Sequence, residues 1–351
     1  MNTNKVSMPN KIFGTVLAHS LRGKMLSKTE LQTLAESRDI DELVTRMKNT
    51  VYLDALAKLT KPYTAEKVES ALREHLVNQH AKIVNIANGS AILSAYFVKY
   101  ITWNLKIILK GKAMGRTYEE LLPKVNLRAE ELVGRRDLVV KALVAKDFDE
   151  AVNSLAGSEF GEDARKAAQA YKEKGDVRVF DTFLDHAFYK SLDRAVVFES
   201  KLQDTNKVAG VDVDSYNVLA VLRGKFWGLS ANEVNDLIVT TGKVSRDVLQ
   251  RMINTEKIQE AIGELAGTAY KELIPRSAAN DIDAIMQLEV AFEKESLKRI
   301  MNSFRTVFTV ANLLASIKLM AFEIRNLAAI AAGVEQKIPS DKILASLVRV
   351  E

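Results

Sequence analysis

The sequence predicts an all-α protein of three similar helical domains arranged around a pseudo-threefold axis. Three observations carry this prediction. Apolar residues recur with the helical period of about 3.6, no convincing run of strict alternation indicates a strand, and one segment occurs three times. Only 5 prolines interrupt the 351 residues, and none lies between Pro123 and Pro275. Long helices are therefore expected along most of the chain.

The repeated segment starts with asparagine, continues with a mostly apolar stretch and reaches glycine seven residues later. Its three copies pair Asn104 with Gly111, Asn217 with Gly224, and Asn326 with Gly333. The first two asparagines lie 113 residues apart and the last two 109, which is a usual size for a domain. We therefore predict helical repeats at 1–113, 114–226 and 227–351, the last with a closing C-terminal helix.

A second block keeps the same period. It occurs at 39–42, 147–150 and 257–260. Eight residues after each copy comes a hydroxyl residue, with an aromatic residue two positions further on, at 50–52, 158–160 and 268–270. Two independent blocks with matching spacing are hard to obtain by chance, so the repeat is expected to fix the architecture.

Helix starts and ends follow the repeat in chain order. The N-terminal segment 21–24 repeats 222–225, so the chain opens with half of the motif. After the first two full copies, glycine falls where a helix should stop. Thr117 with Glu120, and Ser230 with Glu233, then have the spacing of capping boxes that start the next helix. In the third copy, Pro339 has this role.

Two later stretches, 181–192 and 288–297, show apolar residues on one helical face and share the pattern Leu-[Asp/Glu]-x-x-Phe. Each chain end carries half a motif, so closure into a ring would bring the two ends together. An open superhelix has the same repeat and stays an alternative.

Composition limits the function classes. With 47% hydrophobic and 27% charged residues, the chain has a globular balance. The absence of cysteine excludes disulfides and thiolate metal sites and fits a reducing compartment. Residues 1–13 lack the long apolar core of a secretory signal. The most apolar stretches, 83–98 and 307–317, are interpreted as buried helices because a spanning helix needs roughly 20 apolar residues.

No pattern for catalysis or cofactor binding appears. Gly-Lys pairs end at Lys112, Lys225 and Lys243, but each lacks the earlier glycine and the following Ser or Thr of a phosphate-binding loop. The 4 histidines lack the spacing of a metal pair, and no nucleophile elbow occurs. Carboxylates follow helical charge patterns typical of solvated faces. We therefore expect no catalytic residue, cofactor, metal or small-molecule substrate.

The remaining candidates are contact residues. The net charge of +5, from 50 basic and 45 acidic residues, is dispersed and does not indicate nucleic-acid binding. Basic residues flank the repeated glycines and could form a band that docks a partner, although helix C-termini also favour cations. The repeated asparagines could contact a symmetric partner, but a local structural role is favoured. The candidate contact residues are Arg22, Lys24, Lys110, Lys112, Arg223 and Lys225.

Three stretches of the chain, 103–115, 118–123 and 323–333, resemble one known family. That family is the C subunit of archaeal-type (A-type) ATP synthases, which is similar to the d subunit of eukaryotic vacuolar (V-type) ATPases. The resemblance covers nearly the whole chain in order, although Ala328 and Val334 depart from the usual pattern. It implies a funnel-shaped, non-catalytic central-stalk protein, peripheral on the cytoplasmic face of the membrane. Its implied partners are the shaft subunits and the proteolipid ring, which it couples for ATP synthesis or ion transport.

Other functions are compatible with the same residues. A helical scaffold or tethering protein would share the repeat and the lack of chemistry. An all-α enzyme would need converging polar residues at one junction, whereas the sequence places similar residues at all three. A nucleic-acid-binding helical array fits the dispersed charge least well.

Overall fold

The computed structural model describes residues 7–87, 89–239 and 242–348; the first six residues of the expected N-terminal segment lie outside it. The described residues form α-helices and short 3-10 turns, with no strand among them, so the predicted all-α class is confirmed. The α-helices are Met8–Gly23 (α1), Lys28–Ala35 (α2), Ile40–Met47 (α3), Leu53–Leu56 (α4), Ala65–Ile86 (α5), Ala91–Ala113 (α6), Tyr118–Leu121 (α7), Arg128–Leu132 (α8), Arg136–Val144 (α9), Phe148–Ser154 (α10), Gly161–Lys174 (α11), Val179–Phe198 (α12), Gln203–Phe226 (α13), Ala231–Asp236 (α14), Arg246–Asn254 (α15), Ile258–Gly263 (α16), Asp281–Ser303 (α17), Val310–Glu335 (α18) and Ser340–Ser346 (α19).

The predicted capping boxes start the expected helices. Thr117 caps α7 and Ser230 caps α14, each accepting a hydrogen bond from the backbone N–H of the glutamate three residues on. Ser27 with Glu30 forms the same box at α2, in the partial N-terminal copy of the motif. These bonds satisfy backbone donors that a helix start leaves free, and each cap contributes about 1 kcal/mol.

The ends of α6, α13 and α18 share one geometry. The backbone N–H groups of Arg116, Leu229 and Ile338 donate to the carbonyls of Gly111, Gly224 and Gly333 at 2.9, 2.9 and 2.8 Å. The residue before each donor has a positive φ: 74° at Gly115, 66° at Gly228 and 56° at Lys337. This is the Schellman arrangement, in which glycine is favoured at the left-handed position. The third copy achieves it with a lysine.

The repeated glycines themselves lie inside the last turns of these helices and allow a close approach. A Cβ added to Gly224 would lie 2.6 Å from Cγ2 of Val234, and one added to Gly333 would lie 2.6 Å from Cδ1 of Ile343. At Gly111 the neighbour is Leu121, which is closer still. The small residue therefore lets the next short helix pack directly on the long one in all three copies.

The repeated asparagines connect each long helix to the chain 22 residues downstream. Asn104, Asn217 and Asn326 are buried. Their Nδ2 groups donate to the carbonyls of Asn126, Val239 and Val348 at 2.7, 2.9 and 2.8 Å. Their Oδ1 atoms accept from the backbone N–H groups of the same three residues at 3.2, 3.0 and 3.2 Å. The amide side chain thus substitutes for a backbone partner in a buried loop.

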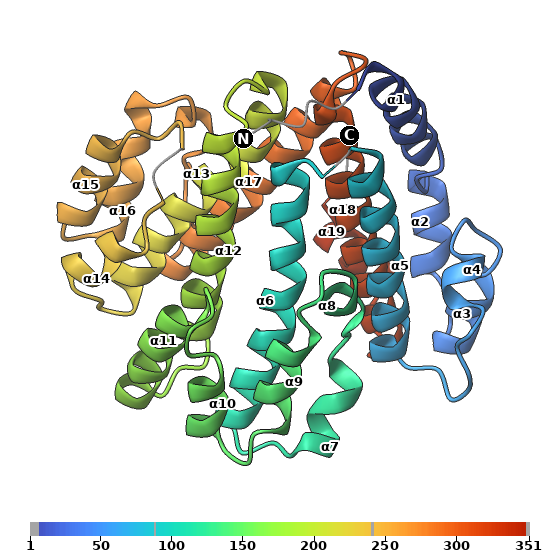
Figure 1. Cartoon of the computed structure of the whole chain (residues 1–351), viewed down its shortest axis with the longest axis horizontal. Coiled ribbons are helices and arrows are strands. Elements are labelled where there is room, and N and C mark those ends of the chain that lie inside the picture. Colours follow the sequence, from blue (N-terminus) through green and yellow to red (C-terminus); the bar gives the residue numbers. More distant parts are fainter. Residues whose placement is uncertain (1–6, 88, 240–241, 349–351) are drawn as a thin grey trace.

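The long helices pack in pairs that join distant segments. α6 packs along α12, α13 along α17, and α18 along α5. The last pair joins the two ends of the chain, as Figure 1 shows on its right-hand side. The predicted domain boundaries at 113 and 226 coincide with the ends of α6 and α13. They therefore separate α6 from α12, and α13 from α17, although these helices pack on each other. The division into three domains at these boundaries stays a prediction.

Side-chain hydrogen bonds also hold the N-terminal part of the chain against α18. The N–H of Leu26 and the hydroxyl of Tyr52 donate to the two carboxylate oxygens of Glu323 on α18 at 2.8 and 2.5 Å. Tyr270 donates to Asp214 on α13 in the same way at 2.6 Å. Burial raises the pKa of both carboxyl groups above the usual value. The buried apolar residues of α2–α5 also share one core with those of α18 and α19.

Helix α6 is long and apolar enough to cross a membrane by length and composition. However, 72% of its most apolar window is buried against the rest of the protein. The stretch 83–98, expected to be one buried helix, is instead divided between the end of α5 and the start of α6. Its apolar residues belong to the protein core, so packing accounts for the composition.

Candidate functional site

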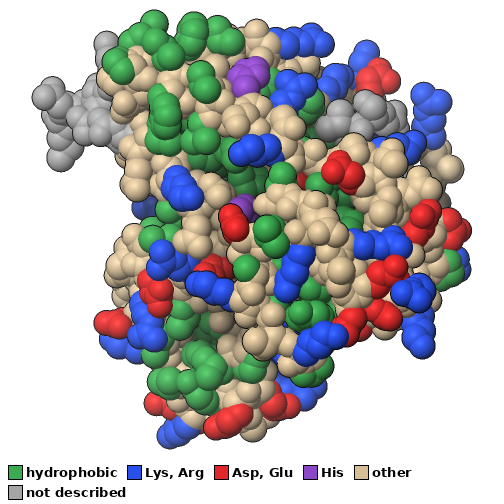
Figure 2. Space-filling model, turned by 90° about the vertical axis from the view of Figure 1, so that its right-hand side faces the viewer, with side chains coloured by type: hydrophobic (Ala, Val, Ile, Leu, Met, Phe, Trp, Pro, Cys, Tyr) green, Lys and Arg blue, Asp and Glu red, His purple; other side chains and the backbone are tan. Residues whose placement is uncertain are grey.

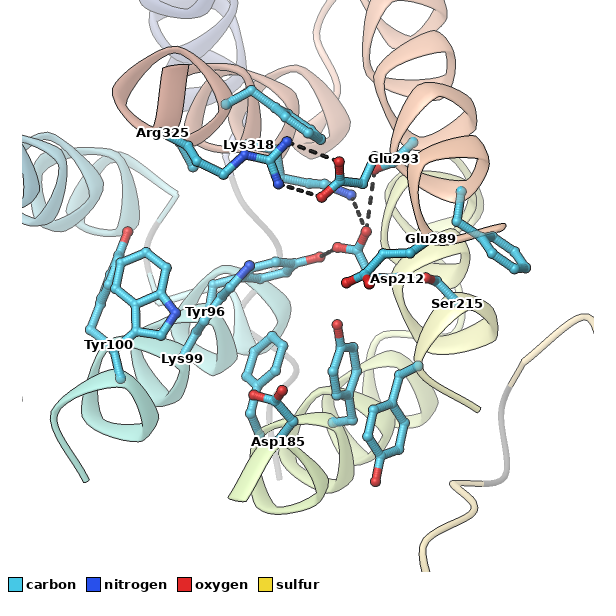
Figure 3. A pocket seen from close by; sticks show the side chains of 18 of the residues that line it. Tyr96, Lys99, Tyr100, Asp185, Asp212, Ser215, Glu289, Glu293, Lys318 and Arg325 are labelled. Atoms are coloured by element: carbon cyan, nitrogen blue, oxygen red, sulfur yellow. Dashed lines mark hydrogen bonds and ion pairs between the residues drawn. The ribbon is translucent and has the colours of Figure 1, made fainter. Parts of the chain in front are cut away.

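A central cavity of about 460 Å³ lies between the six long helices. Helices α6, α13 and α18 contribute one part of its wall, and their packing partners α12, α17 and α5 contribute the rest. Figure 3 shows the polar side chains that point into this space. Because all three helix pairs contribute, the cavity differs from a cleft at one domain junction.

The repeat determines which positions face the cavity. The wall includes the residues five before, one before and two after each repeated asparagine. Residue types differ at these matched positions, so only the spacing repeats. The three sets are Lys99, Asp212 and Ala321; Trp103, Tyr216 and Arg325; and Lys106, Leu219 and Ala328.

The partner helices face the cavity in the same regular way. The shared Leu-[Asp/Glu]-x-x-Phe pattern places Asp185 and Phe188 of α12, and Glu289 and Phe292 of α17, on the wall. The corresponding acidic position on α5 is held by Arg73, which also lines the cavity. The pattern that indicated a helix from sequence therefore marks the cavity-facing side of two of the three partner helices.

Most of the charged side chains on the cavity wall form ion pairs. Its charged side chains are six cations and five carboxylates. Each carboxylate has its own cation among the described residues, and four of the five pairs connect different helices. The pairs are Arg73–Glu69 at 2.5 Å, Lys106–Asp185 at 2.6 Å, Arg223–Glu289 at 2.7 Å, Lys318–Asp212 at 2.7 Å, and Arg325–Glu293.

Asp212 connects four long helices. It accepts from Tyr96 of α6 at 2.7 Å, from Ser296 of α17 at 3.3 Å and from Lys318 of α18 at 2.7 Å. Lys318 also donates to the carbonyl of Val208, at 3.1 Å. Burial and the neighbouring carboxylate raise the pKa of Tyr96 well above its usual value, so the phenol stays a donor. Charged groups this well bonded resist separation of the helices.

Lys99 is the sixth cation. Among the described residues no carboxylate lies within ion-pair distance of it, and Figure 3 draws no dashed line at its side chain. Asp185 and Asp212 affect Lys99 only by electrostatic attraction at a distance, since they are bound to Lys106 and Lys318. Its Nζ lies over the ring of Trp103, 5.8 Å from the ring centroid. Burial lowers the pKa of Lys99.

Two hydroxyl groups on the wall also lack partners. The Tyr216 hydroxyl and Thr182 Oγ1 are buried and make no hydrogen bond within the described part of the chain. Tyr216 stacks on Tyr189 with ring centroids 4.2 Å apart, which holds its ring in place. The wall therefore offers donors as well as charge.

The basic residues predicted as contacts lie in two kinds of environment. Lys112 is buried and donates to the carbonyl of Ala145, and Lys225 donates to the carbonyl of Ile253 at 2.9 Å and to that of Thr255. These carbonyls end α9 and α15, so both lysines neutralise a helix C-terminus, a role that the dipole favours. Lys110 binds Asp181 of α12 at 2.6 Å.

The other candidates differ. Arg223 lines the cavity and binds Glu289, whereas Arg22 lies over the ring of Phe304 at 5.1 Å. Lys24 is exposed after the end of α1 and is the most accessible of the six. The structure thus places Lys110 with Lys112 and Arg223 with Lys225 at matched helix ends. That the six form one docking band stays a prediction.

An apolar face is exposed on α1. Met8, Ile12, Phe13 and Val16 are 60, 45, 60 and 63% exposed and follow helical spacing. The neighbouring loop adds Phe308, whose backbone N–H donates to Thr15 at 2.9 Å. Figure 2 shows hydrophobic side chains gathered over this upper part of the molecule. Such a patch is typical of a surface that contacts another protein.

Apart from Arg223, the sequence did not indicate the charged cavity residues as candidates, because their chemistry does not repeat. Lys99 and Asp212 occupy equivalent positions with opposite charge. Only their fixed distance from the repeated asparagines could have identified them. Among the histidines, His80 and His186 are buried. No group of three or more possible metal ligands occurs within the ranges the structure describes.

Comparison with known proteins identifies the family. The fold and cavity define a helical repeat protein whose long helices enclose a charged interior. A family model described as the ATP synthase (C/AC39) subunit matches residues 15–346. The chain therefore belongs to the ATP synthase (C/AC39) subunit family.

Relatives that are named as the C subunit of A-type ATP synthase agree with this assignment. The protein from Methanocaldococcus jannaschii is 26% identical over 94% of this chain and 84% of its own. The protein from Pyrococcus horikoshii is 26% identical over 92% of this chain and 86% of its own. The protein from Methanococcoides burtonii is 23% identical over 97% of this chain and 95% of its own. The resemblance inferred from the repeated motifs is confirmed.

Proposed function

We propose that this protein is a non-catalytic central-stalk component of a rotary A/V-type ATP synthase or ATPase. It would couple the rotating shaft to the membrane proteolipid ring, for ion-driven ATP synthesis or ATP-driven ion transport. The observation that carries the proposal is membership of the ATP synthase (C/AC39) subunit family over residues 15–346. Its proposed location is peripheral, on the cytoplasmic face of the membrane.

The proposed body consists of three units that close on themselves into a funnel. The three packed helix pairs, α6 with α12, α13 with α17 and α18 with α5, support a body of three similar units, for which the proposed repeats remain 1–113, 114–226 and 227–351. Matched cavity positions on α6, α13 and α18 support a pseudo-threefold relationship. Such a body offers a central opening for a helical shaft and a broad end for a ring.

A part that transmits torque must resist deformation. The buried asparagine bonds at each long helix and the largely buried Lys318–Asp212 pair support this role, since buried and well-bonded polar groups hold a single arrangement. Close packing adds stiffness because protein interiors have low compressibility. All the charged groups on the cavity wall except Lys99 are paired with each other, as structural groups are.

The test is recovery of the tagged protein from gently solubilised membranes, with co-purifying proteins identified by mass. Catalytic, shaft and proteolipid subunits in one complex would support the proposal. The protein alone in a soluble fraction would contradict it and favour a helical scaffold.

Contact residues can be tested in the same preparation. Charge reversal of Arg22, Lys112 and Arg223 together is expected to weaken assembly if the basic turns dock a partner. Because Lys112 is buried and Arg223 has an internal partner, reversal there also lowers stability. Lys24→Glu is the sharper variant, since Lys24 is exposed and its reversal is expected to leave the fold intact. Full assembly with Lys24→Glu would exclude this residue from the contact.

A further inference from the structure

We infer that the central cavity takes a carboxylate from a polypeptide segment of the shaft and that Lys99 binds it. This inference rests on the proposed function and adds the chemistry by which the partner is recognised. It starts from charge: six cations and five carboxylates line the wall, and every carboxylate is already paired within the chain. The missing sixth carboxylate would come from the partner.

The position of Lys99 suits this role. It lies on α6 among residues of the other long helices, where a segment entering the cavity would meet it. The two nearest carboxylates are occupied, Asp212 by Lys318, Tyr96 and Ser296, and Asp185 by Lys106. Reassigning Asp212 to Lys99 would leave Lys318 without a carboxylate. Reassigning Asp185 would leave Lys106 only its longer contact with Asp181, at 3.7 Å, and Lys110 already binds Asp181. The internal network therefore cannot neutralise Lys99 without loss.

Two further donors support an acceptor in the cavity. The hydroxyls of Tyr216 and Thr182 lack partners, and these residues are only 6 and 2% exposed. A buried donor without a partner costs about 1–3 kcal/mol, so an incoming acceptor would recover part of this loss. A carboxylate accepts several hydrogen bonds at once and also neutralises a cation.

Cavity size favours a polypeptide over a free ion. The volume is about 460 Å³, whereas a water molecule occupies about 30 Å³ of the liquid. A small ion would occupy only a small part of this space, with water in the rest, whereas a protein segment could contact the whole wall. Aromatic rings of Trp103, Phe188, Tyr189 and Phe292 also line the wall and would contact the apolar parts of a protein segment.

Zero-length cross-linking in the intact complex tests the contact directly. A carbodiimide activates a carboxyl group, the Lys99 amine attacks it, an amide bond forms with loss of the amine proton, and the reagent leaves as its urea with the carboxyl oxygen. We expect a peptide containing Lys99 joined to an Asp, Glu or C-terminal carboxyl of a shaft protein. Linkage to Asp185 or Asp212 of the same chain alone would overturn the inference.

Substitutions give an independent readout. Lys99→Glu is expected to weaken association of the purified chain with the shaft subunits at least about tenfold, and Lys99→Met by a smaller factor. Lys99→Met should leave the thermal midpoint unchanged or raise it, because it removes an unpaired cation. Lys82→Glu, at an exposed site on α5 outside the cavity, is the matched control and should change neither value.

The outcomes separate the two proposals. If the unsubstituted chain fails to bind the shaft, the proposed function itself fails. If it binds, and Lys99→Glu changes affinity by less than about twofold, only the inference about Lys99 fails. A lower thermal midpoint for Lys99→Met with unchanged affinity would show that Lys99 serves the internal network instead.

Discussion

Asn217 and Val239 exchange two hydrogen bonds although 22 residues separate them. The amide nitrogen of Asn217 donates to the carbonyl of Val239 at 2.9 Å, and the N–H of Val239 donates to its amide oxygen at 3.0 Å. Both residues are buried. The same exchange at Asn104 and Asn326 makes it the common element of the three repeats.

Asn217→Ala should destabilise the protein strongly. The change leaves one buried N–H and one buried carbonyl without partners, at a cost of about 3 kcal/mol. The measurement is the denaturant midpoint of the purified chain, followed by circular dichroism.

Asn217→Asp tests the hydrogen bonds of Asn217 separately from the size and shape of its side chain. Its size is nearly unchanged and it can still accept from Val239, but it cannot donate to the carbonyl, so a large loss is again expected. A midpoint equal to that of the unsubstituted protein in either variant would contradict a structural role for the asparagine.

Gly224→Ala should also destabilise the protein, by about 1–3 kcal/mol, because the new methyl group would lie 2.6 Å from Val234. Combining it with Val234→Ala should cost less than the sum of the two single changes, which a double-mutant cycle measures.

Gly210→Ala is the matched control in the same helix. Nothing lies within 4 Å of a Cβ at this position, so the higher helix propensity of alanine should raise stability by up to about 1 kcal/mol. Equal effects at Gly210 and Gly224 would show that close packing with α14 is not the reason for the repeated glycine.

Local structure could be predicted from sequence because its determinants are near each other in the chain. Thr117 with Glu120 and Ser230 with Glu233 form the predicted caps, and the helices end at the predicted places. The glycine seven residues after the asparagine was harder to interpret, since it serves packing against a helix that follows a turn.

The cavity could not be predicted because it depends on which distant helices pair. Lys106 meets Asp185 across 79 residues, and Lys318 meets Asp212 across 106. Neither pairing follows from a local rule. Equivalent positions in the three repeats also differ in charge, so a search for repeated residue types does not find them. The same long-range pairing explains why Arg223, predicted as a contact, has an internal partner.

Lys337 offers a test of the helix ends. Its φ of 56° is the left-handed conformation that glycine holds in the other two copies, and its side chain is exposed. Lys337→Gly should therefore raise the free energy of unfolding by about 1 kcal/mol. Thermal unfolding measures the change. Lys337→Ala removes the same side chain but keeps a Cβ, so it should give no such gain; equal gains would assign the effect to the lysine charge.

His80 predicts a dependence of stability on pH. The ring is fully buried, with Nδ1 3.0 Å from the Tyr100 hydroxyl and Nε2 2.9 Å from the carbonyl of Leu93. Burial lowers the pKa of His80 from 6.5 to about 4. The unfolded chain therefore binds a proton between these values that the folded chain does not bind, so stability is full above pH 6.5 and falls as the pH drops toward 4.

Between pH 7 and pH 5 this residue alone should reduce the free energy of unfolding by about 2 kcal/mol. His80→Gln keeps a polar group of similar size that does not titrate, so its stability should fall less over the same interval by that amount, whatever its stability at pH 7. Denaturant unfolding of both proteins at the two pH values gives the comparison. Identical pH dependence in the two proteins would mean that His80 is protonated in the folded state, which would require the helices around it to admit water.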